Sequence, residues 1–405
     1  MASQLSTLPV EIVEIIASAL DDNDSTDSCS LRLVCRELER KTLHHFGRTR
    51  LTAVRTDLSW TSLQKLRELS EHEHFGPRVE TLLVQRASES NERGLEFWWN
   101  RHPQGDVIAG QPGAQLLRDL LLHKLTNCRS FQIHKFGYSE SELESHCRMS
   151  SLMPTDAVGT LVAIIAETGL PTKSFHLDYR KEGFGWLDAR RLNMEPLQRP
   201  AFRTTWAHLQ ELSLHLSPAS DTFNWVLELI VRATGLRKLS LSCDHFPGSI
   251  GFLERVSSAV VMPGLQQLRL SVANVAATTL SRLLLRFRDS LRAVSFRKVR
   301  VQGQSDGIWI SIFREMRREL PLLESFSVDH VRDFKNLKRS GDRIVFPALA
   351  DNQVFAGSQG RRAQLTWREW RGEQRVFGVS HDGPGMDQFL ELLARSAEYV
   401  FGPLR

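Results

Sequence analysis

Most of the sequence is organised by one recurring pattern, in which apolar residues occupy the first, fourth and sixth of six consecutive positions. The copies begin at Val79, Cys128, Thr172, Leu209, Leu236, Leu265, Leu291 and Leu323, and Thr172 fills its position imperfectly. The last five copies follow one another at roughly 30 residues, a spacing typical of stacked repeats. Such a chain folds by stacking like units, because one unit cannot bury its apolar side alone.

A helical spacing of apolar residues precedes most copies of the pattern. We predict helices over residues 58–72, 114–125, 155–168, 222–234, 251–261, 277–287 and 307–320. Each helix leads into a strand formed by the second half of the pattern, so successive strands run parallel and the helices cover the outer face. The sequence therefore predicts an α/β fold, a curved solenoid with parallel strands.

The alternation of side chains along each strand predicts which residues face outward from the core. In Leu212-Ser213-Leu214 the leucines point to the core, so the flanking side chains lie on the opposite, concave face. We assign binding of a target to the longer or charged residues of this face, which are His176, Asp178, His215, Lys238, Arg269, Arg297 and Asp329. The mixed charge of this face suits a folded protein partner better than a polyanion.

The N-terminal residues carry a different, purely helical pattern. Pro9 stands in the first turn of an apolar helix, where proline is favoured. Its apolar stripe, which we expect to be buried, consists of Leu8, Ile12, Ile15, Ile16 and Ala19. The acidic run 21–25 interrupts the pattern, and a second amphipathic helix is expected over residues 31–46.

Residues 6–46 resemble an F-box. The resemblance is carried by the Leu8-Pro9 start, the Glu11-Ile12 pair, Leu20 before acidic residues and the Leu-Arg-Leu-Val-Cys-Arg segment at 31–36. In that family short helices pack against a Skp-type adaptor, which implies that the adaptor-facing or core residues here are Leu8, Pro9, Ile12, Ile16, Leu20, Leu31, Val34 and Cys35. The alternative is that this segment is an N-terminal helical cap on the domain that follows.

The repeats resemble leucine-rich repeats, a common partner of an F-box, so the resemblance covers most of the chain. The asparagine that many such repeats place after the strand is missing, and the aligned residues are Ser217, Asp244, Ala273 and Val299. The repeats are therefore degenerate, as in many fungal F-box proteins, and the solenoid is expected to be irregular.

The expected domain boundaries follow from these patterns: an all-α F-box over 1–50, the repeat solenoid over 51–333 and a capping region over 334–405. Two turn-rich segments, 87–113 and 181–205, interrupt the repeats. Their tryptophans either close the core or act as binding anchors. In the capping region we expect a polar loop over 334–362, a hairpin over 365–379 and a helix over 386–399, which together shield the last repeat.

Composition and motifs exclude several classes of function. The net charge of +5 is dispersed among acidic residues, so no footprint for nucleic acid appears. Five cysteines without a Cys-x-x-Cys motif indicate a reducing compartment. No apolar stretch approaches the ~20 residues of a membrane span, so we expect a soluble protein of the cytoplasm, the nucleus or both. The sequence lacks phosphate-loop, dinucleotide and hydrolase motifs, and the histidines at 44, 45, 72 and 74 read as solvated helix residues rather than metal ligands.

Taken with the resemblance, these patterns imply a non-enzymatic substrate receptor of a Skp-cullin-F-box ubiquitin ligase. It would need no cofactor, would bind a Skp-type adaptor and through it a cullin, and would hold an unknown protein target. The alternative is a leucine-rich-repeat scaffold for protein interactions that has no link to ubiquitination.

Overall fold

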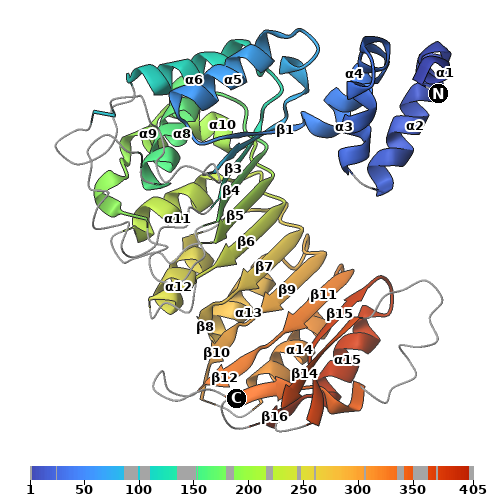
Figure 1. Cartoon of the computed structure of the whole chain (residues 1–405). Coiled ribbons are helices and arrows are strands. Elements are labelled where there is room, and N and C mark those ends of the chain that lie inside the picture. Colours follow the sequence, from blue (N-terminus) through green and yellow to red (C-terminus); the bar gives the residue numbers. More distant parts are fainter. Residues whose placement is uncertain are drawn as a thin grey trace. The chain divides into compact units, whose positions relative to one another are not determined.

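The computed structural model describes residues 2–23, 25–85, 99–100, 110–134, 152, 154–178, 187–215, 222–243, 248–259, 261–304, 307–334, 342–349, 364–370 and 373–400. The chain has a mixed α/β fold with a large, mostly parallel sheet (Figure 1). It divides into two compact units, one formed by the described residues up to Gln132 together with Leu152, and the other by the remaining described residues.

The first unit begins with four helices rather than the expected two. They are α1 (Ala2–Thr7), α2 (Val10–Asn23), α3 (Ser25–Leu33) and α4 (Arg36–Arg50). The acidic run does not end the first long helix, which continues to Asn23. The expected second helix is divided at Cys35, whose extended backbone caps the start of α4.

The rest of the first unit alternates strands and helices as the repeat predicts. Its elements are β1 (Ala53–Thr56), α5 (Trp60–Glu71), a 3-10 turn (Gly76–Arg78), β2 (Thr81–Val84), α6 (Pro112–His123) and β3 (Ser130–His134), which spans the division between the units. Strands β1 and β2 pair in parallel. The Ser59 side chain begins α5 by accepting a hydrogen bond from the backbone N–H of Ser62 at 3.1 Å.

The second unit contains the regular part of the parallel sheet. The parallel strands are β4 (Ser174–Asp178), β5 (Glu211–His215), β6 (Lys238–Ser242), β7 (Gln267–Ser271), β9 (Ala293–Arg297) and β11 (Ser325–Asp329), paired in that order. Two antiparallel strands, β15 (Glu373–Asp382) and β14 (Gln364–Trp370), follow β11 at the edge. The C-terminal hairpin thus extends the sheet of the repeats.

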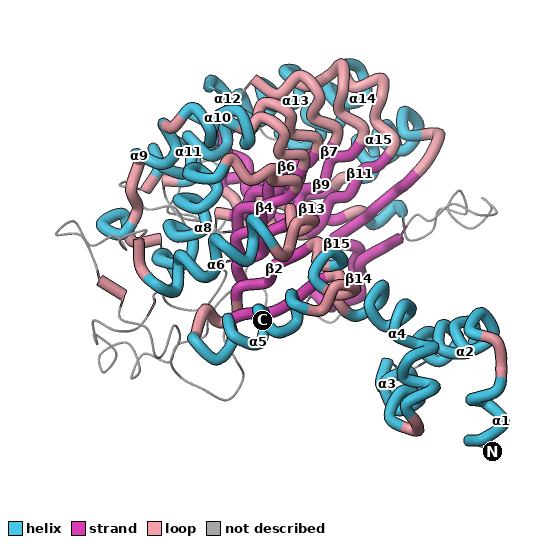
Figure 2. The backbone as a smooth tube through the Cα atoms, turned by 90° about the horizontal axis from the view of Figure 1, so that it is seen from above, coloured by secondary structure: helices cyan, strands magenta, loops and turns pink. Residues whose placement is uncertain are grey.

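Helices cover one face of this sheet, as Figures 1 and 2 show. They are α8 (Pro154–Thr168), α9 (Glu195–Gln198), α10 (Pro200–Trp206), α11 (Phe223–Arg232), α12 (Ser249–Ala259), α13 (Ala277–Arg286), α14 (Ile308–Glu319) and α15 (Met386–Ser396). The longer helices bury their apolar positions, as in α13, where Leu280, Leu283 and Leu284 are buried. The core of the second unit lies between these two layers.

Each late repeat turns sharply after its strand through a residue in the left-handed conformation. The three residues are Val272, Lys298 and His330, with φ between 47° and 53°. Hydrogen bonds from their backbone N–H groups to the next strand hold this conformation, for example from Val272 N to Arg297 O at 2.8 Å. The residue after this turn is apolar and buried, as at Ala273 and Val299. These are positions at which many leucine-rich repeats have asparagine.

A second, smaller sheet follows these turns and was not foreseen from the sequence. Its strands are β16 (Glu398–Val400), β13 (Asp342–Val345), β12 (Arg332–Phe334), β10 (Arg300–Gln302) and β8 (Asn274–Ala276), in that spatial order. Strand β13 lies inside the segment 334–362, which was expected to be a loop. The segment 181–205 likewise contains α9, most of α10 and a 3-10 turn at Ala189–Arg191. A further 3-10 turn covers Pro347–Leu349.

Buried tryptophans link neighbouring repeats. The indole N–H of Trp206 donates to Leu229 O at 2.8 Å, and that of Trp309 donates to Arg332 O at 3.1 Å. Of the tryptophans in the two interrupting segments, Trp99 is buried, and Trp98 and Trp186 lie outside the described residues. Trp99 is therefore a core residue rather than an exposed anchor.

Candidate functional site

The N-terminal helices expose the apolar residues that were expected to be buried. Ile15 is 64% exposed, and Leu33 at the end of α3 is 87% exposed. The buried apolar side chains of this region are instead Val13 and Ala17, one turn apart on α2, and Leu38 on α4. The expectation that the stripe is buried is wrong within this chain, because a neighbouring face of α2 packs against the other helices.

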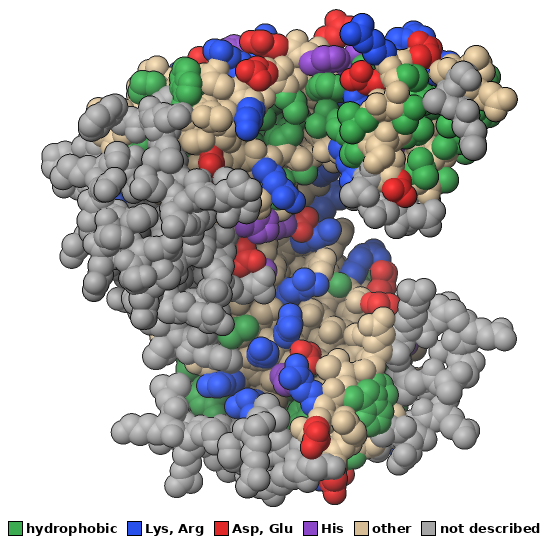
Figure 3. Space-filling view, viewed as in Figure 1, with side chains coloured by type: hydrophobic (Ala, Val, Ile, Leu, Met, Phe, Trp, Pro, Cys, Tyr) green, Lys and Arg blue, Asp and Glu red, His purple; other side chains and the backbone are tan. Residues whose placement is uncertain are grey.

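The residues assigned to an adaptor are all accessible to some degree. Pro9, Ile12 and Val34 are exposed, and the half-buried ones are Leu8, Ile16, Leu20, Leu31 and Cys35. The adaptor-facing set implied by the resemblance leaves out Val10, Ile15 and Leu33, which are among the exposed large apolar side chains of the described residues. Figure 3 shows hydrophobic side chains gathered over this helical region. We call Val10, Ile12, Ile15, Leu33 and Val34 the N-terminal apolar surface.

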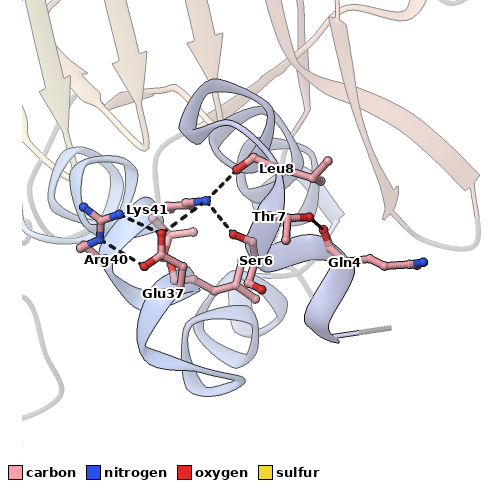
Figure 4. A network of polar contacts seen from close by, with 9 residues as sticks. Gln4, Ser6, Thr7, Leu8, Glu37, Arg40 and Lys41 are labelled. Atoms are coloured by element: carbon pink, nitrogen blue, oxygen red, sulfur yellow. Dashed lines mark hydrogen bonds and ion pairs between the residues drawn. The ribbon is translucent and has the colours of Figure 1, made fainter.

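A polar network fixes the connection between α1 and α2, which consists of Leu8 and Pro9 (Figure 4). The ammonium group of Lys41 donates to Ser6 O at 2.6 Å and to Leu8 O at 2.8 Å. Glu37 lies 3.4 Å from the same ammonium group. One side chain of α4 therefore holds the connection between α1 and α2, because it satisfies the carbonyl groups around that turn.

A second network joins α2, α3 and α4 at the carboxylate of Asp21. It accepts hydrogen bonds from Ser28 at 2.5 Å and Arg50 at 2.6 Å, and His45 Nε2 lies 2.8 Å away. Burial raises the pKa of Asp21, but these hydrogen bonds outweigh burial and lower the pKa to about 2. His45 is 3% exposed, so the expectation of a solvated histidine is wrong at this position.

In the second unit, the residues assigned to target binding share one face of the sheet. The strand register aligns them in rows across the strands. One row is Asp178, His215, Ser242, Ser271, Arg297 and Asp329, and a second is His176, Ser213, Ser240, Arg269, Ser295 and Ser327. Lys238 lies in the third row, between Glu211 and Gln267. We call these rows the polar sheet face.

Histidine, serine and carboxylate side chains meet at one end of the polar sheet face. His215 Nε2 lies 3.3 Å from Ser213 Oγ and 3.2 Å from Ser240 Oγ, and its Nδ1 lies 3.8 Å from Asp178 Oδ2. These residue types form hydrolytic triads in other folds. Here the 3.8 Å separation is too long for the hydrogen bond that orients the imidazole, so the geometry does not favour a nucleophilic serine.

Charges of both signs alternate along the same face. Glu211 lies between His176 Nε2 at 3.8 Å and Lys238 Nζ at 3.7 Å. Burial lowers the pKa of His176, and the charge of His215 lowers it further, against the opposing effect of Glu211. The polar sheet face therefore presents small neutral groups between paired charges.

The other end of the polar sheet face centres on Asp329. Arg297 Nε lies 3.6 Å from its carboxylate, and His330 Nδ1 lies 2.5 Å from it. Burial raises the pKa of Asp329, but the hydrogen bond with His330 and the charge of Arg297 outweigh it, and the pKa falls below its ordinary value. Arg269 is exposed between these two ends. The structure thus brings the seven assigned residues onto one face.

Several further findings bear on function. The sequence Cys243-Asp244-His245 places a thiol next to an acid and an imidazole. Cys243 is buried, and Asp244 and His245 lie outside the described residues. Among the residues that the structure describes, no cluster of three or more His, Cys, Asp or Glu side chains is placed to hold a metal ion. A search of the described helices found none with the length and apolarity needed to cross a bilayer.

The sequence matches no protein-family model, and no curated protein is significantly similar to it.

Proposed function

We propose that the protein is the non-catalytic substrate-recognition subunit of a Skp-cullin-F-box ubiquitin ligase. In this proposal residues 1–50 act as the F-box, and the repeats form a leucine-rich-repeat-like solenoid that binds a protein target. The N-terminal apolar surface is the observation that carries the proposal, because a soluble domain has no internal reason to expose so many large apolar side chains together.

An adaptor that covers this surface would supply the missing half of a hydrophobic core. Burying a side chain such as Ile15 or Leu33 contributes roughly 1.5–3 kcal/mol each. The two polar networks support the same role, because Lys41 and Asp21 fix the helix ends and so preorganise the surface before binding.

The polar sheet face is the proposed target site. Its charges of both signs can be matched by complementary charges on a folded partner, an arrangement that gives specificity to protein interfaces. Binding of a target there would place target lysines near the conjugating enzyme of the ligase, so the protein would act by raising effective concentration. It would act in the cytoplasm or the nucleus, where such ligases work.

A scaffold without a link to ubiquitination is the second candidate. It is favoured by the close packing of α4 on the rest of the first unit, where a Cβ added to Gly47 would lie 2.9 Å from Arg78 Cδ. Helices held this closely can serve as a cap of the repeats. The two candidates differ in whether the N-terminal apolar surface binds an adaptor.

The test is co-purification of the full chain with a Skp-type adaptor. The variant is Ile15→Asp combined with Leu33→Asp, because both side chains are exposed and their replacement leaves the helix packing intact. Val261→Asp is the matched control, since Val261 is 61% exposed in the second unit. We expect the wild type and the control to form a stoichiometric complex and the double variant to lose it, with unchanged circular dichroism.

Absence of a complex with the wild-type chain would refute the receptor proposal. So would a double variant that binds the adaptor as tightly as the control. Ile15→Asp alone provides a milder variant, which is expected to weaken the complex at least tenfold because one buried aliphatic side chain is replaced by a charge.

A further inference from the structure

Three positively charged residues lie on a diagonal across the middle of the polar sheet face. Lys238, Arg269 and Arg297 belong to the neighbouring strands β6, β7 and β9, and the register places each of them one row further along the strands than the one before. Because strands lie about 4.8 Å apart and rise about 3.3 Å per residue, successive members have Cα atoms roughly 8 Å apart. We call these three residues the cationic diagonal.

The other positions of the polar sheet face on these three strands carry no acidic side chain. They are Ser240, Ser242, Gln267, Ser271, Ala293 and Ser295. The carboxylates that approach the diagonal come from the next strands outward, since Glu211 on β5 lies 3.7 Å from Lys238 and Asp329 on β11 lies 3.6 Å from Arg297. Three positive charges therefore meet two negative charges, and the excess lies in the middle.

Arg269 is the middle member of the cationic diagonal and carries this excess. It is exposed, and within the described ranges it forms no ion pair, whereas Lys238 and Arg297 each form one. Its direct neighbours across the strands are Ser240 and Ser295, which are both half-buried. The guanidinium group of Arg269 thus stands between short hydroxyl side chains. Figure 3 shows Lys and Arg side chains gathered over the strands of the second unit.

The two ion pairs beside Arg269 are loose. The side chains of Lys238 and Arg297 are 55% and 62% exposed, and their separations from Glu211 and Asp329 are longer than hydrogen bonds. Exposed pairs of this kind contribute little to stability, because water screens them. Lys238 and Arg297 can therefore turn towards a ligand at little cost in free energy.

We propose that Arg269 is the specificity-determining residue of the polar sheet face, and that it selects a target segment with an Asp or Glu side chain at its centre. A guanidinium group binds a carboxylate through two parallel N–H···O bonds, which an amide side chain cannot reproduce. The hydroxyl groups of Ser240 and Ser295 can donate further hydrogen bonds to the same carboxylate. One carboxylate cancels the single excess charge, whereas a phosphate dianion would leave the site negative.

This inference rests on the proposed function, because it names the chemistry that the proposed target site recognises. It does not involve the N-terminal apolar surface. A chain that prefers acidic segments but binds no adaptor would refute only the receptor proposal. A chain that binds an adaptor but shows no such preference would refute only this inference.

The test is a peptide array probed with the labelled full chain. Each nine-residue peptide has Asp, Glu, Asn, Gln, Lys or phosphoserine at its centre, and its flanking positions are mixtures of neutral residues. The variants are Arg269→Gln, which removes the charge, and Arg269→Glu, which reverses it. Arg314→Gln is the control, because Arg314 is exposed on α14 in the helical layer. Circular dichroism verifies that the variants fold, as expected for substitutions at exposed positions.

We expect the wild type and the control to bind Asp- and Glu-centred peptides about tenfold more tightly than Asn- and Gln-centred ones, because the acidic centres gain a charge-assisted pair of hydrogen bonds. Arg269→Gln is expected to lose this preference. Arg269→Glu is expected to prefer Lys-centred peptides instead. A residue with a purely structural role would not reverse the charge preference of the site.

Three outcomes would overturn the inference. The first is a wild type that binds none of the peptides, or that binds acid-centred and amide-centred ones equally. The second is an acid preference that persists in Arg269→Gln. The third is tighter binding of phosphoserine than of Asp and Glu, since the site would then accept a dianion rather than a carboxylate.

Discussion

The Asp21 network provides the sharpest test of how the N-terminal helices are held together. Asp21→Asn keeps the shape of the side chain but removes the charge that faces Arg50 and one of the acceptor oxygens. The pKa of Asp21 lies at about 2 against an ordinary 3.8. This difference corresponds to at most about 2.5 kcal/mol of stability, since one pKa unit is equivalent to about 1.4 kcal/mol.

The assay is hydrogen exchange of the full chain, read by mass spectrometry. A loss of about 2.5 kcal/mol makes local opening roughly 60-fold more frequent. We therefore expect peptides from α2 to α4 to exchange up to about 60-fold faster in Asp21→Asn, while peptides from the second unit stay unchanged. Asp27→Asn is the control, because Asp27 is exposed on α3. Equal exchange in Asp21→Asn and the wild type would refute the reasoning.

The same network predicts that the stability of the N-terminal helices decreases at acid pH. The pKa of Asp21 is lower in the folded chain than in the unfolded chain. Its contribution to the stability of the N-terminal helices is therefore complete above about pH 4. It is lost as the pH falls from about 4 towards 2, because protonation removes the interaction with Arg50. Exchange of α4 should therefore accelerate over this range in the wild type, beyond the intrinsic effect of pH, and less so in Asp21→Asn.

Two further predictions test the packing of the repeats. Gly235→Ala should destabilise the protein by about 1–3 kcal/mol in thermal unfolding, because the new Cβ would overlap Ala207 O. Gly264→Ala, which meets nothing within 4 Å, should have little effect, and equal effects would contradict the close packing. Burial raises the pKa of Cys128 to about 12, so iodoacetamide at pH 8 should leave it unmodified in the folded protein while it alkylates the more accessible Cys35. Alkylation of both at similar rates would show that the repeat around Cys128 opens.

Local periodicity was sufficient to locate the repeated elements. The helix expected over 277–287 is observed at Ala277–Arg286, and the helix expected over 307–320 at Ile308–Glu319. Alternation also predicted the polar sheet face, because neighbouring side chains of any strand point to opposite sides. These features depend on residues a few positions apart, which a single sequence displays directly.

Periodicity failed where a pattern permits more than one environment. The spacing of Ile12 and Ile15 predicts an apolar helix face, but it does not say whether that face packs inside the chain or remains exposed. The structure buries Val13 and Ala17 instead, because the direction from which α4 approaches selects the buried face. That direction depends on contacts between α2 and α4, which no local spacing encodes.

The sequence by itself determined where the repeated pattern lies, that the strands of this pattern run parallel and which side chains lie opposite the buried leucines. Only the tertiary structure decided which residues meet across strands. Arg300, Arg332 and Arg343 belong to no common motif, and they are aligned because the turns at Lys298 and His330 place β10 and β12 in register and the antiparallel strand β13 pairs with β12. Strand register arises from stacking of whole repeats, so charges distant in sequence become neighbours only when the fold is complete.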